Sequence, residues 1–320
     1  MWKFAPILKT TIWGGNNIIP LKHMEAAISE VGESWEISSV PGSVSVVESG
    51  PDEGLTLNEL IDRYGSDLMG ERNYKKFDNS FPLLVKIIDA ADNLSVQVHP
   101  DDSTAAGLGY PNGKTEMWYV LNAGKDARIA NGFTRPVDPE EYESLVESGR
   151  IEEILKYINI KAGEVYYIPA GRVHAICKNC TMVEVQQTSD ATFRIYDYHR
   201  KDKDGNEREL HTALARQAIN FADIEGESVD YTLRPNFPVN VIRSPFFSIN
   251  ILEADTGLMR DYSESDTFVV ITALDGETEI ICGGKTETLT AGLSVLIPAS
   301  ATGIAIEPHK RVRLLEAYIK

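Results

Sequence analysis

The sequence is poor in cysteine, in long apolar runs and in positive charge. Its 320 residues include three cysteines, Cys177, Cys180 and Cys282. This odd, low count argues against a disulfide framework and favours a reducing compartment. Cys177 and Cys180 have a C-x-x-C spacing but lack the second cysteine pair that a structural zinc site usually needs. We therefore interpret Lys178-Asn179 as a hairpin turn between two strands.

No apolar run approaches the roughly 18 residues that a membrane-spanning helix needs, and no basic segment followed by an apolar stretch marks the N-terminus. The net charge is −17, from 48 acidic and 31 basic residues. Such a charge disfavours nucleic acids and anionic membranes, because binding to either depends on attracting phosphate. We expect a soluble, cytoplasmic protein with neither partner, in which a few local basic residues hold any phosphate ligand.

Four helices are expected among many short strands. Residues 56–59, Thr-Leu-Asn-Glu, form a capping box that opens the first helix. A second helix is predicted from Asp138, a third after Gly149 and a fourth over residues 209–221. The third is predicted because four apolar side chains would share one helical face: Ile151, Ile154, Leu155 and Ile158.

The expected strands differ in how they are buried. Residues 81–89 are an almost continuous apolar run, typical of a strand covered on both faces. Residues 94–99 alternate, which places Ser95, Gln97 and His99 on one face. Further strands are expected at 116–121 and 165–169.

An internal repeat indicates a duplicated unit. The phrase Ala-Gly-x-x-x-x-Ile-Pro-Ala occurs at 162–170 and again at 291–299, an offset of 129 residues. Residues 120–124 resemble 270–274 at an offset of 150, and the difference of 21 residues matches a helical insertion at about 138–158. The simplest interpretation is a mainly β protein with two related β-barrels, the first of which carries this insertion.

The repeat also predicts how the chain divides. A proline-rich stretch at 234–238 separates a first domain, 1–235, from a second, 236–320. His174 follows the repeated phrase in the first copy, whereas the offset of 129 places Gly303 there in the second. We expect the second barrel to hold no metal ligand and to serve as a cap or in oligomerisation. The sequence does not decide the oligomeric state, for which a monomer and a homodimer are the two alternatives.

Two of the six histidines stand beside turn residues at the ends of expected strands. These are His99 and His174, and Glu116 lies between them in the chain. A barrel mouth collects strand ends, so two imidazoles and a carboxylate would converge there as metal ligands with positions open to substrate. Gln97 shares the strand face of His99 and would add a fourth ligand. A set without thiolate suits Zn²⁺, Mn²⁺, Co²⁺ or Fe²⁺.

Five ordered motifs resemble those of the bacterial short-form type I mannose-6-phosphate isomerases, in the cupin superfamily. They are F-P-L-L-V-K (81–86), S-V-Q-V-H-P-D-D (95–102), G-K-T-E-M-W-Y (113–119), Y-I-P-A-G-R-V-H-A-I (167–176) and E-V-Q-Q-T-S-D-A-T-F-R-I-Y-D (184–197). The resemblance implies cupin-type, jelly-roll barrels and an aldose–ketose isomerase. Such an enzyme interconverts mannose 6-phosphate and fructose 6-phosphate through an enediol, using one Zn²⁺ or another divalent first-row metal.

The resemblance also implies roles for individual residues. The family's catalytic arginine corresponds to Arg194, for which the alternative is a structural ion pair with Asp190 or Asp197. The residues that correspond to the metal ligands are His99, Glu116 and His174, with Gln97 in some members. Those that correspond to substrate contacts are Trp13, as a wall of the pocket, and Ser95 and Arg200, for the phosphate.

Two lysines and a glutamate complete the candidates. Lys86 interrupts an apolar strand, where a lysine without a role would be costly, and Lys114 shares the strand face of Glu116. Either is a candidate phosphate contact or proton donor. Glu184, Lys114 and a metal-bound water remain candidates for the general base, with His199 a more remote one. Two other functions stay open: a different metal-dependent cupin enzyme, such as a dioxygenase, and an inactive sugar-phosphate-binding protein.

Overall fold

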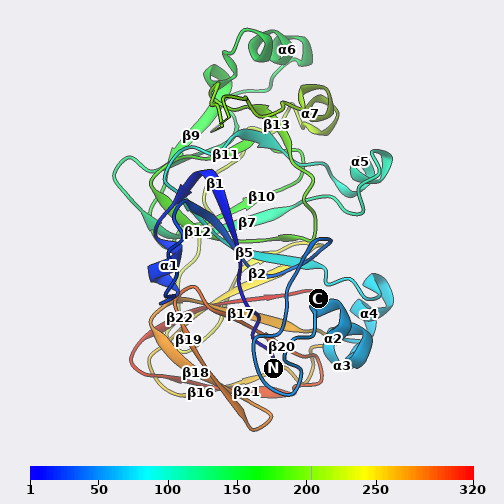
Figure 1. The fold of residues 1–320 in the computed structure, drawn as a ribbon, viewed down its shortest axis with the longest axis vertical. Helices are drawn as coiled ribbons and strands as arrows, with labels where there is room; N and C mark the ends of the chain where they lie inside the picture. The colour runs from blue at the N-terminus through cyan, green and yellow to red at the C-terminus, as the bar shows by residue number, and fades with distance from the viewer. Residues whose placement is uncertain (203) are drawn as a thin grey trace.

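Four β-sheets, arranged in two pairs along the long axis, form the framework of the structure (Figure 1). The structure is a computed structural model that describes residues 1–202 and 204–320. The expectation of a mainly β fold is confirmed. No helix among the described residues is long and apolar enough to cross a membrane.

The first pair joins a six-stranded sheet to a five-stranded one. In spatial order the six strands are β1 (Ile7–Gly15), β2 (Val31–Ile37), β5 (Leu83–Ala90), β12 (Cys180–Gln187), β7 (Glu116–Ala123) and β10 (Val165–Ile168). The five are β13 (Phe193–Tyr196), β6 (Val96–Val98), β11 (His174–Ile176), β8 (Arg128–Phe133) and β9 (Leu155–Asn159).

The second pair joins a five-stranded sheet to a four-stranded one. The five strands are β14 (Val239–Arg243), β15 (Ser248–Ala254), β22 (Val312–Tyr318), β17 (Val269–Asp275) and β20 (Ser294–Ile297). The four are β16 (Leu258–Asp261), β21 (Gly303–Pro308), β18 (Glu277–Cys282) and β19 (Lys285–Thr290). A small separate ribbon is formed by β3 (Ser39–Val40) and β4 (Ser43–Val44).

The helices are short and lie at the margins of the sheets (Figure 1). They are α1 (Ile18–Leu21), α2 (Leu57–Tyr64), α3 (Ser66–Met69), α4 (Glu71–Phe77), α5 (Asp102–Gly107), α6 (Pro139–Glu147) and α7 (Thr212–Ala218). The capping box predicted at 56–59 is confirmed at the start of α2, with Thr56 and Glu59 bonded reciprocally. Asp138 caps α6 as expected.

The helix predicted after Gly149 is wrong, and the fourth is shorter than expected. Residues Ile151–Ile154 form a single 3₁₀ turn, and strand β9 begins at Leu155 and pairs with β8. The apolar spacing suited a helix, but a long-range strand pairing determines the conformation of this segment. The fourth helix, α7, covers 212–218 rather than 209–221. The turn predicted at Lys178-Asn179 is confirmed between β11 and β12, with Asn179 at a positive φ of 69°. It is not a hairpin, because β11 and β12 belong to different sheets and do not pair with each other.

The strand order repeats between the two pairs. The order β2-β5-β12-β7-β10 corresponds to β14-β15-β22-β17-β20, and β6-β11-β8-β9 corresponds to β16-β21-β18-β19. The register pairs Val165 with Tyr119 and Ser294 with Thr272. The strands before the repeated phrase are therefore offset by 153 residues rather than the predicted 150.

The two sheet pairs pack face to face through one large apolar core. Val85 and Val183, from β5 and β12, share this core with Ile249 and Leu315, from β15 and β22. The N-terminus also contacts the second pair, because the backbone of Trp2 is hydrogen-bonded to that of Leu296 in β20. Strand β5 is consequently buried along its whole length, as its apolar sequence predicted.

The opposite faces of these sheets line the interiors of the two pairs. In the second pair, Ile304 packs with Ile271 and Ile297 in the interior. The side chain that faces inward on β21 is thus Ile304, one residue after the predicted equivalent, Gly303. A shift of one residue turns a strand position to the other face. Apolar residues therefore fill the part of the second interior that corresponds to His174.

One polar position recurs in both interiors. Glu184 on β12 pairs with Lys86 on β5, and Glu316 on β22 pairs with Asn250 on β15. Both glutamates are buried. Glu316 is held by Arg260, Asn250 and Tyr262 in a closed hydrogen-bonded cluster.

Candidate active site

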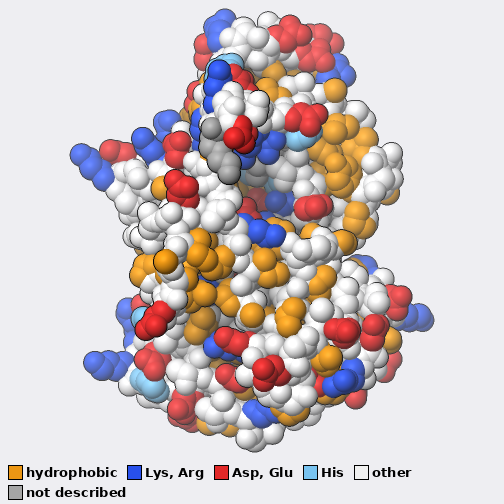
Figure 2. Space-filling view, viewed as in Figure 1, with side chains coloured by type: hydrophobic (Ala, Val, Ile, Leu, Met, Phe, Trp, Pro, Cys, Tyr) orange, Lys and Arg blue, Asp and Glu red, His pale blue; other side chains and the backbone are white. Residues whose placement is uncertain are grey.

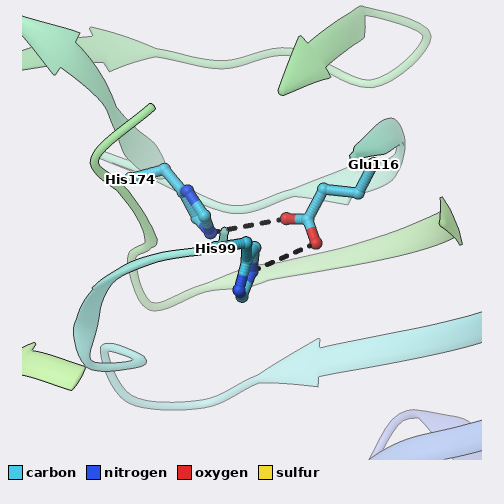
Figure 3. Close-up of side chains that lie close together, drawn as sticks. All are labelled: His99, Glu116 and His174. Carbon is cyan, nitrogen blue, oxygen red and sulfur yellow. Dashed lines mark ion pairs between the residues drawn. The ribbon is translucent and has the colours of Figure 1, made fainter. Parts of the chain in front are cut away.

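His99, Glu116 and His174 converge in the interior of the first sheet pair, as the sequence predicted (Figure 3). His99 directly follows β6, while Glu116 begins β7 and His174 begins β11. One ligand atom from each residue lies within 4.8 Å of the others. The imidazole Nε2 atoms are 3.3 Å (His99) and 3.4 Å (His174) from the two carboxylate oxygens of Glu116.

Backbone carbonyls fix the orientation of both imidazoles. Nδ1 of His99 lies 2.8 Å from the carbonyl oxygen of Ala191, and Nδ1 of His174 lies 2.9 Å from that of Arg172. A carbonyl oxygen only accepts, so each Nδ1 donates its proton and each Nε2 presents a lone pair to the site. This is the arrangement of histidines that bind metals through Nε2.

The electrostatics of the three residues also suit a metal ion. Burial lowers the pKa of His99 to about 3 and lowers the pKa of His174. Burial alone would raise the pKa of Glu116, but the nearby Lys114 and His99 hold it well below its usual value. Two neutral imidazoles and one carboxylate are the protonation states that metal binding requires.

Unsatisfied atoms provide a further test of the fit. Among the described residues, Nε2 of His99 and both carboxylate oxygens of Glu116 are buried without a hydrogen-bond partner, although Nζ of Lys114 forms an ion pair with Oε2 of Glu116 at 3.2 Å. Such groups are costly unless a ligand compensates them, and these donors are ones that a divalent first-row metal accepts. The side-chain amide of Gln97 lies 3.3 Å from Nε2 of His174 and is placed to contribute as well.

A cavity of about 180 Å³ opens beside this cluster. Its lining includes most of the residues singled out in the sequence: Trp13, Lys86, Ser95, Gln97, Lys114, Glu184 and Arg194. It also includes Glu33 and Arg208, which the sequence analysis did not identify as site residues. Figure 2 shows the surface hollowed over this half of the molecule, with basic and acidic side chains inside the hollow.

Lys86 and Glu184 form a buried ion pair in the wall of the cavity. Nζ of Lys86 is 3.2 Å from Oε1 of Glu184 and 3.8 Å from Glu33. Burial opposes the charge on Lys86, but Glu33 and Glu184 outweigh it and raise its pKa. Burial and the negative charge of Glu116 raise the pKa of Glu184. The indole Nε1 of Trp118 donates to Glu184 at 2.9 Å and holds it in place.

Arg194 lies in line with the metal-site residues. The strand register places Gln97 opposite His174 on one side and opposite Arg194 on the other. Within the described chain, Arg194 forms no ion pair with Asp190 or Asp197, the alternative that the sequence left open. Asp197 instead pairs with Arg200 and Arg208.

Two candidates lie away from the cavity lining. Arg200 also donates to the backbone of Asn93 and lies 3.5 Å from Asp92. The side chain of His199 is 72% exposed, with Glu207 as its neighbour. Neither residue is among those that line the cavity.

Comparisons with known proteins agree with this geometry. The family model described as "Phosphomannose isomerase type I, catalytic domain" matches residues 1–128, which include His99 and Glu116. A mannose-6-phosphate isomerase from Bacillus subtilis is 33% identical over 301 residues, covering 92% of each chain. One from Streptococcus mutans is 33% identical over 288 residues, covering 90% of this chain and 89% of the relative.

Solved structures share the fold over the whole chain. The crystal structure of the mannose 6-phosphate isomerase from Bacillus subtilis superimposes with a TM-score of 0.86 at 30% identity, covering 99% of both chains. A zinc-bound mannose 6-phosphate isomerase superimposes with a TM-score of 0.78 at 17% identity, which supports the fold alone. From this near full-length similarity, the chain belongs to the type I mannose-6-phosphate isomerase family.

Proposed function

We propose that this chain interconverts mannose 6-phosphate and fructose 6-phosphate. The observation that carries the proposal is the buried His99–Glu116–His174 cluster, whose neighbours Gln97 and Lys114 line a cavity with several basic side chains. Lys86, Lys114, Arg194 and Arg208 bring positive charge to one cavity in a protein whose net charge is −17. This concentration of charge suits a phosphorylated sugar better than a neutral organic substrate.

We propose that one Zn²⁺ per chain is the resident metal, held by His99, Glu116 and His174 with Gln97 as a further ligand. The neutral, tautomer-fixed imidazoles and the Glu116 oxygens without a hydrogen-bond partner support this assignment. When bound, the cation would polarise the sugar carbonyl and stabilise negative charge on the adjacent oxygens.

The protein residues have separate roles in the proton transfer between C1 and C2. Trp13 and Ser95 line the cavity and would orient the sugar. Arg194, which has no carboxylate partner among the described residues, would stabilise the enediolate. Glu184 and Lys114 remain the side-chain candidates for the base. The raised pKa of Glu184 suits a group that takes and returns a proton. His199 is too exposed for this role.

We further propose that each sheet pair is a cupin-type β-barrel. In this assignment, residues 1–235 form the catalytic domain and 236–320 form a second barrel that binds no metal. The insertion predicted at about 138–158 then ends before β9, because β9 is the counterpart of β19. The shared strand order and the apolar interior around Ile304 support the assignment. A monomer and a homodimer are both compatible with this proposal. A cytoplasmic location remains a prediction.

The proposal is tested by turnover and metal content together. Metal-free protein is reconstituted with Zn²⁺, Mn²⁺ or Co²⁺ and assayed for conversion of mannose 6-phosphate. We expect turnover that EDTA removes and that His174→Ala abolishes, with loss of bound metal. His309→Ala is the matched control, because His309 lies exposed on the second sheet pair beside Glu277. Absence of turnover with all three metals would refute the isomerase assignment.

A further inference from the structure

Arg208 reaches the cavity because the segment around it folds back against β13. The guanidinium Nη1 of Arg194 donates to the carbonyl of Glu209 at 2.7 Å, and the amide of His211 donates to the carbonyl of Arg194 at 2.7 Å. The amide of Arg194 in turn donates to Nδ1 of His211 at 3.2 Å. These bonds attach residues 208–211 to the outer edge of the sheet, beyond Arg194.

Because of this attachment, Arg208 lies farther from the candidate metal ligands than Arg194 does. His174, Gln97 and Arg194 occupy one row across β11, β6 and β13. With neighbouring strands about 4.8 Å apart, Arg194 lies roughly 10 Å across the sheet from His174, and the Arg208 segment lies further out. A substrate whose carbonyl is at the metal would therefore extend its opposite end past Arg194 toward Arg208.

A single carboxylate orients Arg208 in this position. Nε of Arg208 donates to Oδ2 of Asp197 at 2.7 Å, and Nη2 donates to Oδ1 at 2.6 Å. This paired contact fixes the plane of the guanidinium and leaves Nη1 without a described partner. Asp197 is buried, whereas the side chain of Arg208 is 26% exposed and lines the cavity. A purely structural ion pair would not require that exposure.

Positive charge exceeds negative charge at this end of the cavity. Arg200 contacts Asp197 as well, so one buried carboxylate serves two guanidiniums. Burial and the charges of Arg208 and Arg200 lower the pKa of Arg194, which indicates that the three cations repel one another. A dianion bound at Arg208 would relieve this repulsion.

We infer that Arg208, positioned by Asp197, binds the phosphate group of the substrate. The inference rests on the proposed function, since it assigns the phosphate end of the same substrate. Arg200 then supports Asp197 from outside the cavity, in place of the phosphate contact that the family resemblance implied for it. Asp197 is a positioning residue, because it acts through Arg208.

The test compares Arg208→Gln, Arg208→Lys and Asp197→Asn with the wild-type protein. Arg216→Gln is the control, because Arg216 is a half-exposed arginine on α7 that pairs only with Glu143 among the described residues. KM and kcat for mannose 6-phosphate, inhibition by inorganic phosphate and metal content are measured for each. Loss of charge-assisted hydrogen bonds predicts a KM increase of roughly 10- to 100-fold in Arg208→Gln, with metal content unchanged and kcat within about twofold.

The other variants separate positioning from simple loss of charge. Arg208→Lys should recover part of the affinity, because it keeps the charge but not the paired geometry. Asp197→Asn should raise KM and weaken phosphate inhibition even though Arg208 is intact. An unchanged KM in Arg208→Gln, or a loss of kcat at constant KM, would overturn the inference while leaving the isomerase proposal standing. If the wild-type protein shows no turnover, calorimetric binding of inorganic phosphate to wild type and Arg208→Gln still decides the inference: equal affinity would overturn it.

Discussion

Replacement of Arg260 by methionine should destabilise the protein without impairing catalysis. Glu316 is 1% exposed in the interior of the second sheet pair, and Arg260 holds it through two hydrogen bonds of 2.7 and 2.9 Å. The remaining partners of Glu316 are the neutral groups of Asn250 and Tyr262. Arg260→Met would therefore leave a buried carboxylate without any compensating cation.

The size of the effect follows from this geometry. Removing one partner of a buried ion pair costs about 3–5 kcal/mol. The side chain of Arg260 is 17% exposed, so water can partly replace it, and we expect the lower limit, about 3 kcal/mol. Such a loss should lower the thermal midpoint by roughly 5–10 °C. Adding Glu316→Gln removes the unpaired charge, so the double variant should recover about 2 kcal/mol.

Urea unfolding followed by far-UV circular dichroism measures the free energy of unfolding for the wild type, both single variants and the double variant. Turnover of mannose 6-phosphate, measured in parallel, should be unchanged at 25 °C because the cluster lies outside the first sheet pair. A free energy of unfolding within about 0.5 kcal/mol of wild type for Arg260→Met would refute the reasoning. So would a double variant no more stable than Arg260→Met alone.

Three further predictions concern the site, a helix and a thiol. Glu184→Gln should lower kcat by roughly 10²- to 10⁴-fold if Glu184 is the base. The content of bound metal, measured by elemental analysis, should not change. If Lys114→Met instead shows this loss of kcat, the base is Lys114. Thr56→Ala removes the capping box of α2 and should cost about 1 kcal/mol in urea unfolding, and an unchanged midpoint would contradict this. Burial raises the pKa of the Cys180 thiol to about 12, so the native protein should resist alkylation at pH 8 and react only on unfolding or at far higher pH; rapid native labelling at Cys180 would be the contrary result.

The sequence predicted the His99–Glu116–His174 cluster because its candidate metal ligands are concentrated in short motifs. His99, Glu116 and His174 each stand beside turn residues at a strand end, and such ends meet in space once the sheets form. Arg208 was missed for the opposite reason. It follows a run of charged residues that resembles an exposed loop, and only the hydrogen bonds between residues 209–211 and Arg194 direct it toward the cavity.

Errors in the fold prediction arose where long-range pairing overrides local pattern. The apolar spacing of Ile151, Ile154, Leu155 and Ile158 suits a helix, but it also suits a 3₁₀ turn followed by a strand, and pairing with β8 decides between them. In the second copy of the repeat, the inward-facing positions are shifted by one residue, so Ile304 rather than Gly303 points into the interior. The sequence offset alone cannot show which side of a strand faces the core.

The shared core between the two sheet pairs has a consequence for synthesis on the ribosome. Val85 and Val183 are buried only when β15 and β22 cover them, and those strands belong to the last part of the chain. At about 5–20 residues per second, translating the roughly 80 residues from β14 onward takes on the order of 4–16 s. During that interval the nascent catalytic half carries an uncovered apolar sheet, so the yield of folded enzyme should depend on translation speed and on chaperones that shield such surfaces.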